Sequence, residues 1–288
     1  MEGTRGRAQE TDWTLVILPK NRWLDIDMRE IIRYRDLVWL FVNRDFITVY
    51  KQTILGPIWF VIQPLLTTIM YAFVFGNLAK IGTNGIPFLL FYYGGSMLWT
   101  YFEQCFKSSS DAFIANAGLF GKVYFPRLTV PISKVFSNMI SLAIQFATLM
   151  VFFAYYLATG SEVRPQWSII AFPVLIVWIA AIGTGFGMIV SALTTKYRDL
   201  RQLVGFGLNL WMYATPIVYP LSSIPEKYAW VFYVNPVSAP IELFRVMFYG
   251  SGMVGPAHIV TSVASTIVVL VLGLLLFNHN ERTFIDVA

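Results

Sequence analysis

Six long apolar runs are the feature that most constrains this chain. They fill most of the sequence between residues 54 and 277, and a helix needs roughly 17 to 25 residues to cross a bilayer. Composition agrees, because 57% of the 288 residues are hydrophobic and only 13% are charged, whereas a soluble domain carries about 25% charge. The sequence therefore predicts an all-α polytopic membrane protein with six transmembrane helices. The runs are 54–78, 88–106, 130–157, 167–193, 203–219 and 258–277, of which the fifth is the weakest because it is short and contains Pro216.

Basic residues are divided unevenly among the segments that join these runs. If the N-terminus lies inside, 17 Lys and Arg residues fall in inner segments and 4 in outer segments. Short basic loops stay on the cytoplasmic side of a membrane. We therefore expect both termini to be cytoplasmic, with a tail over residues 1–22 and another over residues 278–288. The net charge of +5 then reflects topology and anionic lipid, and a nucleic-acid-binding role is excluded.

The segment before the first run has its own pattern. Apolar residues recur at three- and four-residue spacing, while Arg29, Arg33 and Asp36 occupy the other side. This pattern is typical of a helix that lies in the membrane interface. We predict an amphipathic interfacial helix and connecting segment over residues 23–53, followed by the transmembrane domain over 54–277. The apolar positions are Leu24, Met28, Ile31, Tyr34, Val38 and Phe41.

A Leu-Gly-Pro step joins this interfacial segment to the first run. Gly56 permits a sharp turn, and Pro57 suits an early helical position. The step is therefore interpreted as the corner at which the chain enters the bilayer. A plain helix start would also explain the turn, but it would leave the polar residues before it unexplained. Arg44, Tyr50 and Lys51, together with Gly56 and Pro57, are candidate substrate-entrance residues, with anchoring to anionic lipid as the alternative for the two basic side chains.

Inside the runs, charged side chains are scarce. Only Glu103 and Lys134 occur there, each near a predicted cytoplasmic end, and Glu103 can pair with Lys107 one helical turn later. Carriers driven by protons or sodium need ionisable groups or broken helices near the midplane, and none is visible. His258 and His279 flank the last run at opposite ends, so no metal site is expected.

Glycine-rich segments give no nucleotide site either. The stretch AGLFGKV at 117–123 has two residues rather than four between its glycines, so it is not a phosphate-binding loop. Gly183, Gly185 and Gly187 lie inside an apolar run, where small residues allow close helix packing. No nucleophile and base suited to hydrolysis are apparent. The chain is therefore expected not to be an enzyme, and energy for active transport would come from a partner on the cytoplasmic side.

Four motifs resemble one family. The stretches RDFITVYKQTILGPIWFVIQP from residue 44, KVYFPRLTVPISKV from 122, KYRDLRQLVGFGLNLWMYATPIVYP from 196 and NPVSAPIELFR from 235 are similar to those of the polysaccharide-exporting ABC-2 permeases. These are the Wzm-type membrane subunits of O-antigen, teichoic-acid and capsule exporters. The resemblance implies a homodimer in the bacterial inner membrane, paired with two ATPase subunits that bind ATP and Mg, and no cofactor in this chain. The implied substrate is a lipid-linked glycan, although neither the sugar nor the lipid carrier can be named.

The resemblance also implies roles for particular segments. The inner loop over residues 107–131 would form a coupling helix that contacts the ATPase subunit. Pro-rich residues 220–257 would form short re-entrant helices that gate the outer side. The loop 196–201 is a second contact, a brace or an ordinary basic turn. Aromatic rings could line a glycan channel, or anchor the helices at the interface. The candidates are, for coupling, Gly118, Phe120, Lys122, Tyr124, Phe125, Pro126 and Arg127; for the gate, Asn235, Pro236, Glu242 and Arg245; and for the channel, Trp59, Tyr71, Tyr92, Tyr93, Trp99, Tyr101, Trp211, Tyr213 and Tyr219.

Two other functions stay open on the sequence. An ABC-2 permease for a small lipid, a drug or haem would share the six runs, but it should lack the amphipathic helix and its Leu-Gly-Pro corner. A passive channel or structural membrane protein would not purify with an ATPase.

Overall fold

The computed structural model describes residues 32–51, 56–120, 123, 125–194 and 199–287, and every regular element in these residues is a helix. Short 3₁₀ turns precede α3, α8 and α10, and a π-helical stretch extends α3. In chain order the elements are α2 (Arg35–Lys51), η1 (Gly56–Ile58), α3 (Trp59–Tyr71), η2 (Ala72–Leu78), α4 (Phe88–Ser110), α5 (Ala112–Ala115), α6 (Ala117–Phe120), α7 (Thr129–Ala158), η3 (Trp167–Ala171), α8 (Phe172–Thr194), α9 (Leu200–Tyr213), η4 (Leu221–Ser223), α10 (Glu226–Val234), α11 (Ser238–Tyr249) and α12 (Pro256–Val287).

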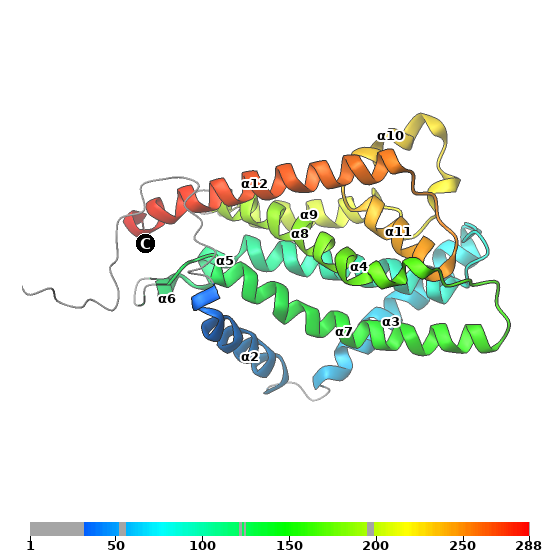
Figure 1. Ribbon diagram of the computed structural model, residues 1–288, viewed down its shortest axis with the longest axis horizontal. Coiled ribbons are helices and arrows are strands. Elements are labelled where there is room, and N and C mark those ends of the chain that lie inside the picture. The colour runs from blue at the N-terminus through cyan, green and yellow to red at the C-terminus, as the bar shows by residue number, and fades with distance from the viewer. Residues whose placement is uncertain (1–31, 52–55, 121–122, 124, 195–198, 288) are drawn as a thin grey trace, which may run out of the picture.

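The long helices form a bundle whose two ends differ (Figure 1). One end carries α2, the short helices α5 and α6, and the C-terminal part of α12. The other carries α10, α11 and the loops that follow η2 and α7. We call these the α2 end and the α11 end. By the distribution of basic residues, the α2 end is the one expected in the cytoplasm.

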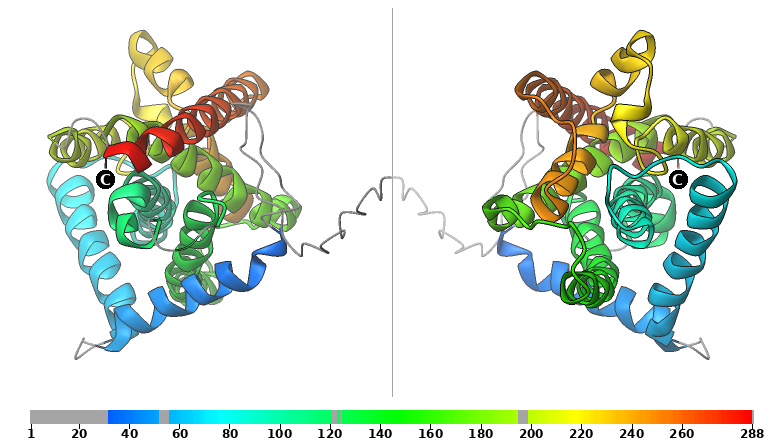
Figure 2. Two further views of the ribbon diagram at one scale, coloured as in Figure 1. Left: turned by 90° about the vertical axis from the view of Figure 1, so that its left-hand side faces the viewer. Right: turned by 90° about the vertical axis from the view of Figure 1, so that its right-hand side faces the viewer.

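Helix α4 lies in the middle of the bundle, as the views along the long axis show (Figure 2). Of its 23 residues, 16 are buried, from Leu90 to Ser110. Its buried side chains include three tyrosines and several serines, which would be costly against lipid. A helix shielded by its neighbours does not need the apolar surface that a lipid-facing helix needs. This central position explains why α4 can be less apolar than the other long helices.

Glycines on α8 allow two neighbours to approach closely. A Cβ atom added to Gly187 would lie 2.5 Å from the carbonyl oxygen of Phe106 on α4. On the opposite face, a Cβ at Gly273 of α12 would lie 2.6 Å from the carbonyl oxygen of Gly185. Only glycine fits at these crossings, as in other close helix pairs of membrane proteins. The interpretation of the Gly183–Gly187 stretch as a packing motif is confirmed.

Four helices are long and apolar enough to cross a membrane by length and composition, within the described ranges. The other two predicted runs correspond to α4, which carries Glu103, Gln104 and Lys107, and to the 14-residue α9. The chain is therefore a helical membrane protein, and the count of six spans stays a prediction. The four candidate spans are Gly56–Leu78, Thr129–Ala158, Trp167–Thr194 and Pro256–His279.

The predicted interfacial helix is described only in part. Residues 1–31, with Leu24, Met28 and Ile31, lie outside the described residues, and α2 begins at Arg35. Phe41 and Val42 of α2 are buried, whereas Trp39 and Leu40 are exposed. At the other terminus, α12 continues to Val287 and so passes through the predicted boundary at residues 277 and 278.

Candidate functional site

The predicted entrance residues lie on α2 and at the turn into α3. Arg44 and Lys51 both belong to helix α2, and both are exposed. Because residues seven positions apart in a helix are separated by about two turns, the two side chains share one face. Tyr50 belongs to α2, but its side chain lies outside the described residues. Gly56 has φ of +47°, a value that glycine adopts without strain, and Pro57 follows in the 3₁₀ turn η1. The backbone at this step therefore has a conformation that favours glycine.

Asp45 is a residue of this region that sequence reasoning missed. Its Oδ1 accepts a hydrogen bond from Arg44 Nη2 (3.0 Å), and its Oδ2 accepts one from Lys134 Nζ of α7 (2.7 Å). Ser137 Oγ donates to the same Oδ2 over 3.3 Å. Asp45 and Lys134 are 89 positions apart, so no local pattern could have paired them. The carboxylate fastens α2 to α7, and with two cations around one anion the cluster keeps a positive charge.

The predicted channel aromatics fall into three groups by exposure. Tyr92, Tyr93, Trp99 and Tyr101 of α4 are buried among the helices of this chain. Trp59 and Tyr213 are exposed. Tyr71, Trp211 and Tyr219 are partly buried and pack against the core. The structure brings Trp99 and Trp211 together, with ring centroids 6.3 Å apart, and the Trp211 indole N–H donates to Asn235 Oδ1 (3.0 Å).

Residues 111–128 connect α4 to α7 at the α2 end, and we call them the coupling segment. Gly118 is exposed, Phe125 and Arg127 are buried, and Pro126 is partly buried. Lys122, Tyr124 and the side chain of Phe120 lie outside the described residues. From α9, Arg201 Nε donates to Asp111 Oδ1 over 2.8 Å, which joins the start of α9 to the start of this segment.

An apolar cluster holds the coupling segment in place. The Phe125 ring meets Phe41 of α2 edge to face, with centroids 5.8 Å apart. Phe113 of α5 stacks on Phe277 of α12 at 4.3 Å. Met188 of α8 belongs to the same buried cluster. Because the cluster combines α2, α5, α7, α8 and α12, a displacement of the coupling segment would be felt by all of them.

At the α11 end, the predicted gate residues Glu242 and Arg245 form a buried ion pair. Both side chains are 2% exposed, and Arg245 Nη1 donates to Glu242 Oε1 (2.5 Å). Arg245 Nη2 also donates to the Ile217 carbonyl (3.1 Å), and Glu242 Oε2 accepts from the Met253 backbone N–H (3.0 Å). The guanidinium carbon of Arg245 lies 3.8 Å from the ring centroid of Phe91 on α4. One ion pair therefore joins α11 to three other segments.

Asn235 forms a second polar junction at the same end. Its Oδ1 accepts from Trp211 Nε1 and from the Val237 backbone N–H, over 3.0 and 3.1 Å. Its Nδ2 donates to Thr215 Oγ1 (2.9 Å) and to the Ala214 carbonyl (3.1 Å). The amide thus fixes the end of α9 against the start of α11. Next to it, the Pro236 carbonyl accepts a hydrogen bond from Ser262 of α12.

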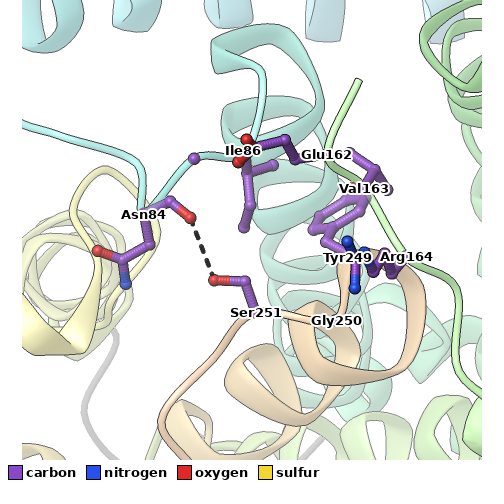
Figure 3. A pocket seen from close by; sticks show the side chains of 9 residues that line it. Asn84, Ile86, Glu162, Val163, Arg164, Tyr249, Gly250 and Ser251 are labelled. Atoms are coloured by element: carbon purple, nitrogen blue, oxygen red, sulfur yellow. Dashed lines mark hydrogen bonds between the residues drawn. The ribbon is translucent and has the colours of Figure 1, made fainter. Parts of the chain in front are cut away.

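A small polar pocket opens at the outer surface of the α11 end (Figure 3). Its volume is about 210 Å³, and its lining includes the charged side chains of Glu162 and Arg164. Ser251 Oγ donates to the Asn84 carbonyl across one side of it (3.3 Å). Across the described ranges, no group of three His, Cys, Asp or Glu residues could hold a metal ion.

Comparison with known proteins places this arrangement in a family. Residues 36–249 match the family described as ABC-2 type transporter. An O-antigen export system permease protein RfbA of Klebsiella pneumoniae is 30% identical over 253 residues, covering 88% of this chain and 95% of the relative. The RfbA permease of Myxococcus xanthus is 25% identical over 90% of this chain and 98% of its own length. The polysialic acid transport protein KpsM of Escherichia coli is 22% identical, covering 84% and 92%. The family match spans most of the bundle, and this chain belongs to the ABC-2 type transporter family.

Proposed function

We propose that this chain is the permease subunit of an ATP-driven exporter that carries a lipid-linked polysaccharide across the bacterial cytoplasmic membrane. The observation that carries the proposal is similarity over nearly the whole length of relatives named for O-antigen export and polysialic acid transport. The helical bundle and the buried ion pair between α9 and α12 agree with that role.

In this proposal six helices cross the membrane: α3 with η2, α4, α7, α8 with η3, α9 with the residues after it, and α12. Helix α2 lies along the cytoplasmic surface, with its exposed Trp39 and Leu40 in lipid. Both termini are cytoplasmic. Helices α10 and α11 re-enter the membrane from the outer side, where Asn235, Pro236, Glu242 and Arg245 hold the gate.

The working transporter is a homodimer of this chain with two ATPase subunits. ATP and Mg are bound by those subunits, and this chain needs no cofactor of its own. The coupling segment is their contact, because it is the longest loop at the α2 end and combines exposed residues, Gly118 and Val123, with a buried anchor, Phe125. Force on this loop would reach α2, α8 and α12 through the apolar cluster.

The glycan lipid enters at the corner between α2 and α3. Its diphosphate headgroup would meet Arg44 and Lys51, and each basic residue near an anionic surface contributes about 1 kcal/mol of attraction. Aromatic rings such as Trp59 and Trp211 would then pass the neutral sugars along. Charge reversal of Arg44 and Lys51 to Glu should reduce export while the subunits still assemble. Unchanged export would refute the entrance role, and loss of assembly would favour lipid anchoring.

The central experiment is co-expression of this chain with candidate ATPase subunits, followed by reconstitution in vesicles. We expect an ATPase to co-purify, ATP turnover only when it is present, and outward movement of a lipid-linked glycan. ATP turnover by this chain alone, above the level of an inactive-ATPase control, would contradict the proposal. Transport of a small lipid, a drug or haem, without transport of glycan, would favour an ABC-2 permease for small molecules. Ion conductance without any ATPase would indicate a passive channel.

A further inference from the structure

A row of polar side chains runs between α4 and α7, and none of the functions above uses it. Asn138 Nδ2 donates to Ser108 Oγ over 3.2 Å, and Ser141 Oγ donates to Gln104 Oε1 over 3.1 Å. Gln145 Nε2 continues the row with a contact of 3.5 Å to Ser141 Oγ. We call Gln104 and Ser108 of α4, with Asn138, Ser141 and Gln145 of α7, the polar seam.

The spacing of these residues is helical. Gln104 and Ser108 are four positions apart on α4, and Asn138, Ser141 and Gln145 are three and four positions apart on α7. Residues at these spacings lie on one face of a helix, so each set forms a line of side chains towards the other helix. Ser141 is 5% exposed and Gln145 is 2% exposed. In an apolar bundle, a polar side chain that loses its partner finds no water to replace it. The seam therefore specifies one register of α4 against α7.

The seam also has a particular place in the bundle. Helices α4 and α7 are joined by the coupling segment, so the two helices and that segment form a hairpin with the coupling segment at its tip (Figure 1). Gln104 is six residues from the end of α4, which is about 9 Å along a helix at 1.5 Å per residue. Measured along α4, the hydrogen bonds thus lie within about two helical turns of the coupling segment, so a displacement of that segment would reach them early.

The other face of α4 is built differently. Against α8 it packs through Gly183 and Gly187, whose missing side chains let the backbones touch. Smooth close packing of this kind fixes distance but offers few directional bonds along the helix axis. Hydrogen bonds between Gln104 and Ser141 oppose sliding, because any shift along the axis stretches them.

From this contrast we propose that the polar seam locks α4 and α7 into one rigid lever. Gln104, Asn138 and Ser141 are positioning residues for transport: they keep α4 from slipping past α7, so that movement of the coupling segment is delivered along the hairpin into the bundle. Asp45 extends the lever to α2 through Lys134 and Ser137 of the same helix. The proposal rests on the proposed function.

The first test separates coupling from mere stability. In the reconstituted complex, Gln104→Leu with Ser141→Ala should lower glycan export per ATP hydrolysed several-fold, while the ATPase subunit still co-purifies. The exchange Gln104→Ser with Ser141→Gln restores a hydrogen bond in the opposite direction and should recover most of the ratio. Ser265→Ala is the matched control, because the Ser265 hydroxyl lies outside the polar seam and donates to the Thr261 carbonyl of its own helix. An unchanged export-to-ATP ratio in the Leu/Ala variant would overturn the proposal.

The second test replaces one hydrogen bond of the seam, between Asn138 and Ser108, by a covalent bridge. In a Cys105→Ala background, Ser108→Cys and Asn138→Cys can be bridged by a short bis-methanethiosulfonate reagent, with each single cysteine as control. A rigid lever keeps exporting after the bridge forms, whereas arrest of export would show that α4 and α7 must slide and would overturn the proposal. Export by the unmutated chain distinguishes failure of the proposed function from failure of the lever proposal. If the unmutated chain exports no glycan with any ATPase subunit, the proposed function itself is wrong.

Discussion

Both ends of the bundle carry an ion pair at helical spacing, in opposite surroundings. At the α11 end, the side chains of Glu242 and Arg245 are each 2% exposed, and Arg245 Nη2 and Glu242 Oε2 reach the backbone of two other segments. Towards the α2 end, the side chains of Glu103 and Lys107 are 24% and 53% exposed on α4. Buried charges depend on every partner they keep, whereas exposed ones can exchange their partner for water.

This difference separates a fixed end from an adaptable one. The α11 end is held by directional hydrogen bonds of Asn235, Glu242 and Arg245, which tolerate little displacement. At the α2 end, Asp45 ties α2 to α7, but the coupling segment itself is held mainly by aromatic and aliphatic contacts around Phe125, which can shift slightly. An end that receives force from another subunit benefits from the second kind of contact, and an outer seal benefits from the first.

The largest effect is expected from breaking the buried pair. Arg245→Ala leaves the Glu242 carboxylate buried without its cation, which costs about 3 to 5 kcal/mol of folding stability. Replacing both residues, as Glu242→Leu with Arg245→Met, should cost less than Arg245→Ala because no buried charge is left. Thermal unfolding in detergent measures the order. A double variant less stable than Arg245→Ala would show that the two side chains stabilise the fold by more than neutralising each other's charge.

Removing the second junction should have a smaller effect. Asn235→Ala leaves the Trp211 indole N–H and the Val237 backbone N–H without their acceptor, at a cost of about 1 to 3 kcal/mol. The matched control at the opposite end is Asn43→Ala, because Asn43 is exposed on α2. Its unfolding temperature should change little. Equal losses in the two variants would contradict the distinction between the ends.

A change in the apolar cluster should cost less again. Phe125→Leu keeps an apolar side chain in the buried site but loses the edge-to-face contact with Phe41, so a loss of up to about 1.5 kcal/mol is expected. Unfolding of the purified chain measures the stability, and co-purification measures ATPase binding. A loss as large as that of Arg245→Ala would mean that the α2 end is as rigid as the α11 end.

The smallest effect is expected for the exposed pair. Lys107→Gln removes an (i, i+4) interaction worth about 0.3 to 0.5 kcal/mol in such positions. Added salt screens the pair further, so the difference from the parent should shrink between low and high ionic strength. A salt-independent loss above about 1 kcal/mol would indicate that Lys107 has a structural role beyond Glu103.

How far the sequence predicts the molecule depends on whether a feature is local. The run predicted at 130–157 became α7 (Thr129–Ala158), and the predicted partner of Glu103 is Lys107, because periodicity and spacing record such features within a few turns. The packing role of the α8 glycines also followed from their setting. In contrast, the predicted end of the fifth run at residue 219 lies beyond α9, which stops at Tyr213.

Long-range pairs were beyond sequence reasoning. The contacts of Asp45 with Lys134, of Gln104 with Ser141 and of Asn235 with Trp211 join residues 89, 37 and 24 positions apart. Each residue alone is an ordinary polar side chain near or within an apolar run, so only the packing of the helices selects its partner. Arg245 and Glu242 could be named as gate residues from a motif, but their contacts to Ile217 and Met253 could not.

The central position of α4 has a consequence for how the chain is made. Helices enter the membrane one after another during synthesis, and each is judged by its own transfer free energy at that moment. Helix α4 carries Glu103, Gln104 and Lys107, and the helices that will shield it, α7 and α8, are synthesised later. In the proposed topology α4 crosses the membrane, and its residence in lipid is then expected to depend on early association with α3 and on the arrival of α7. Biogenesis of this chain would then be a cooperative event in which α4 becomes stable only once its neighbours surround it.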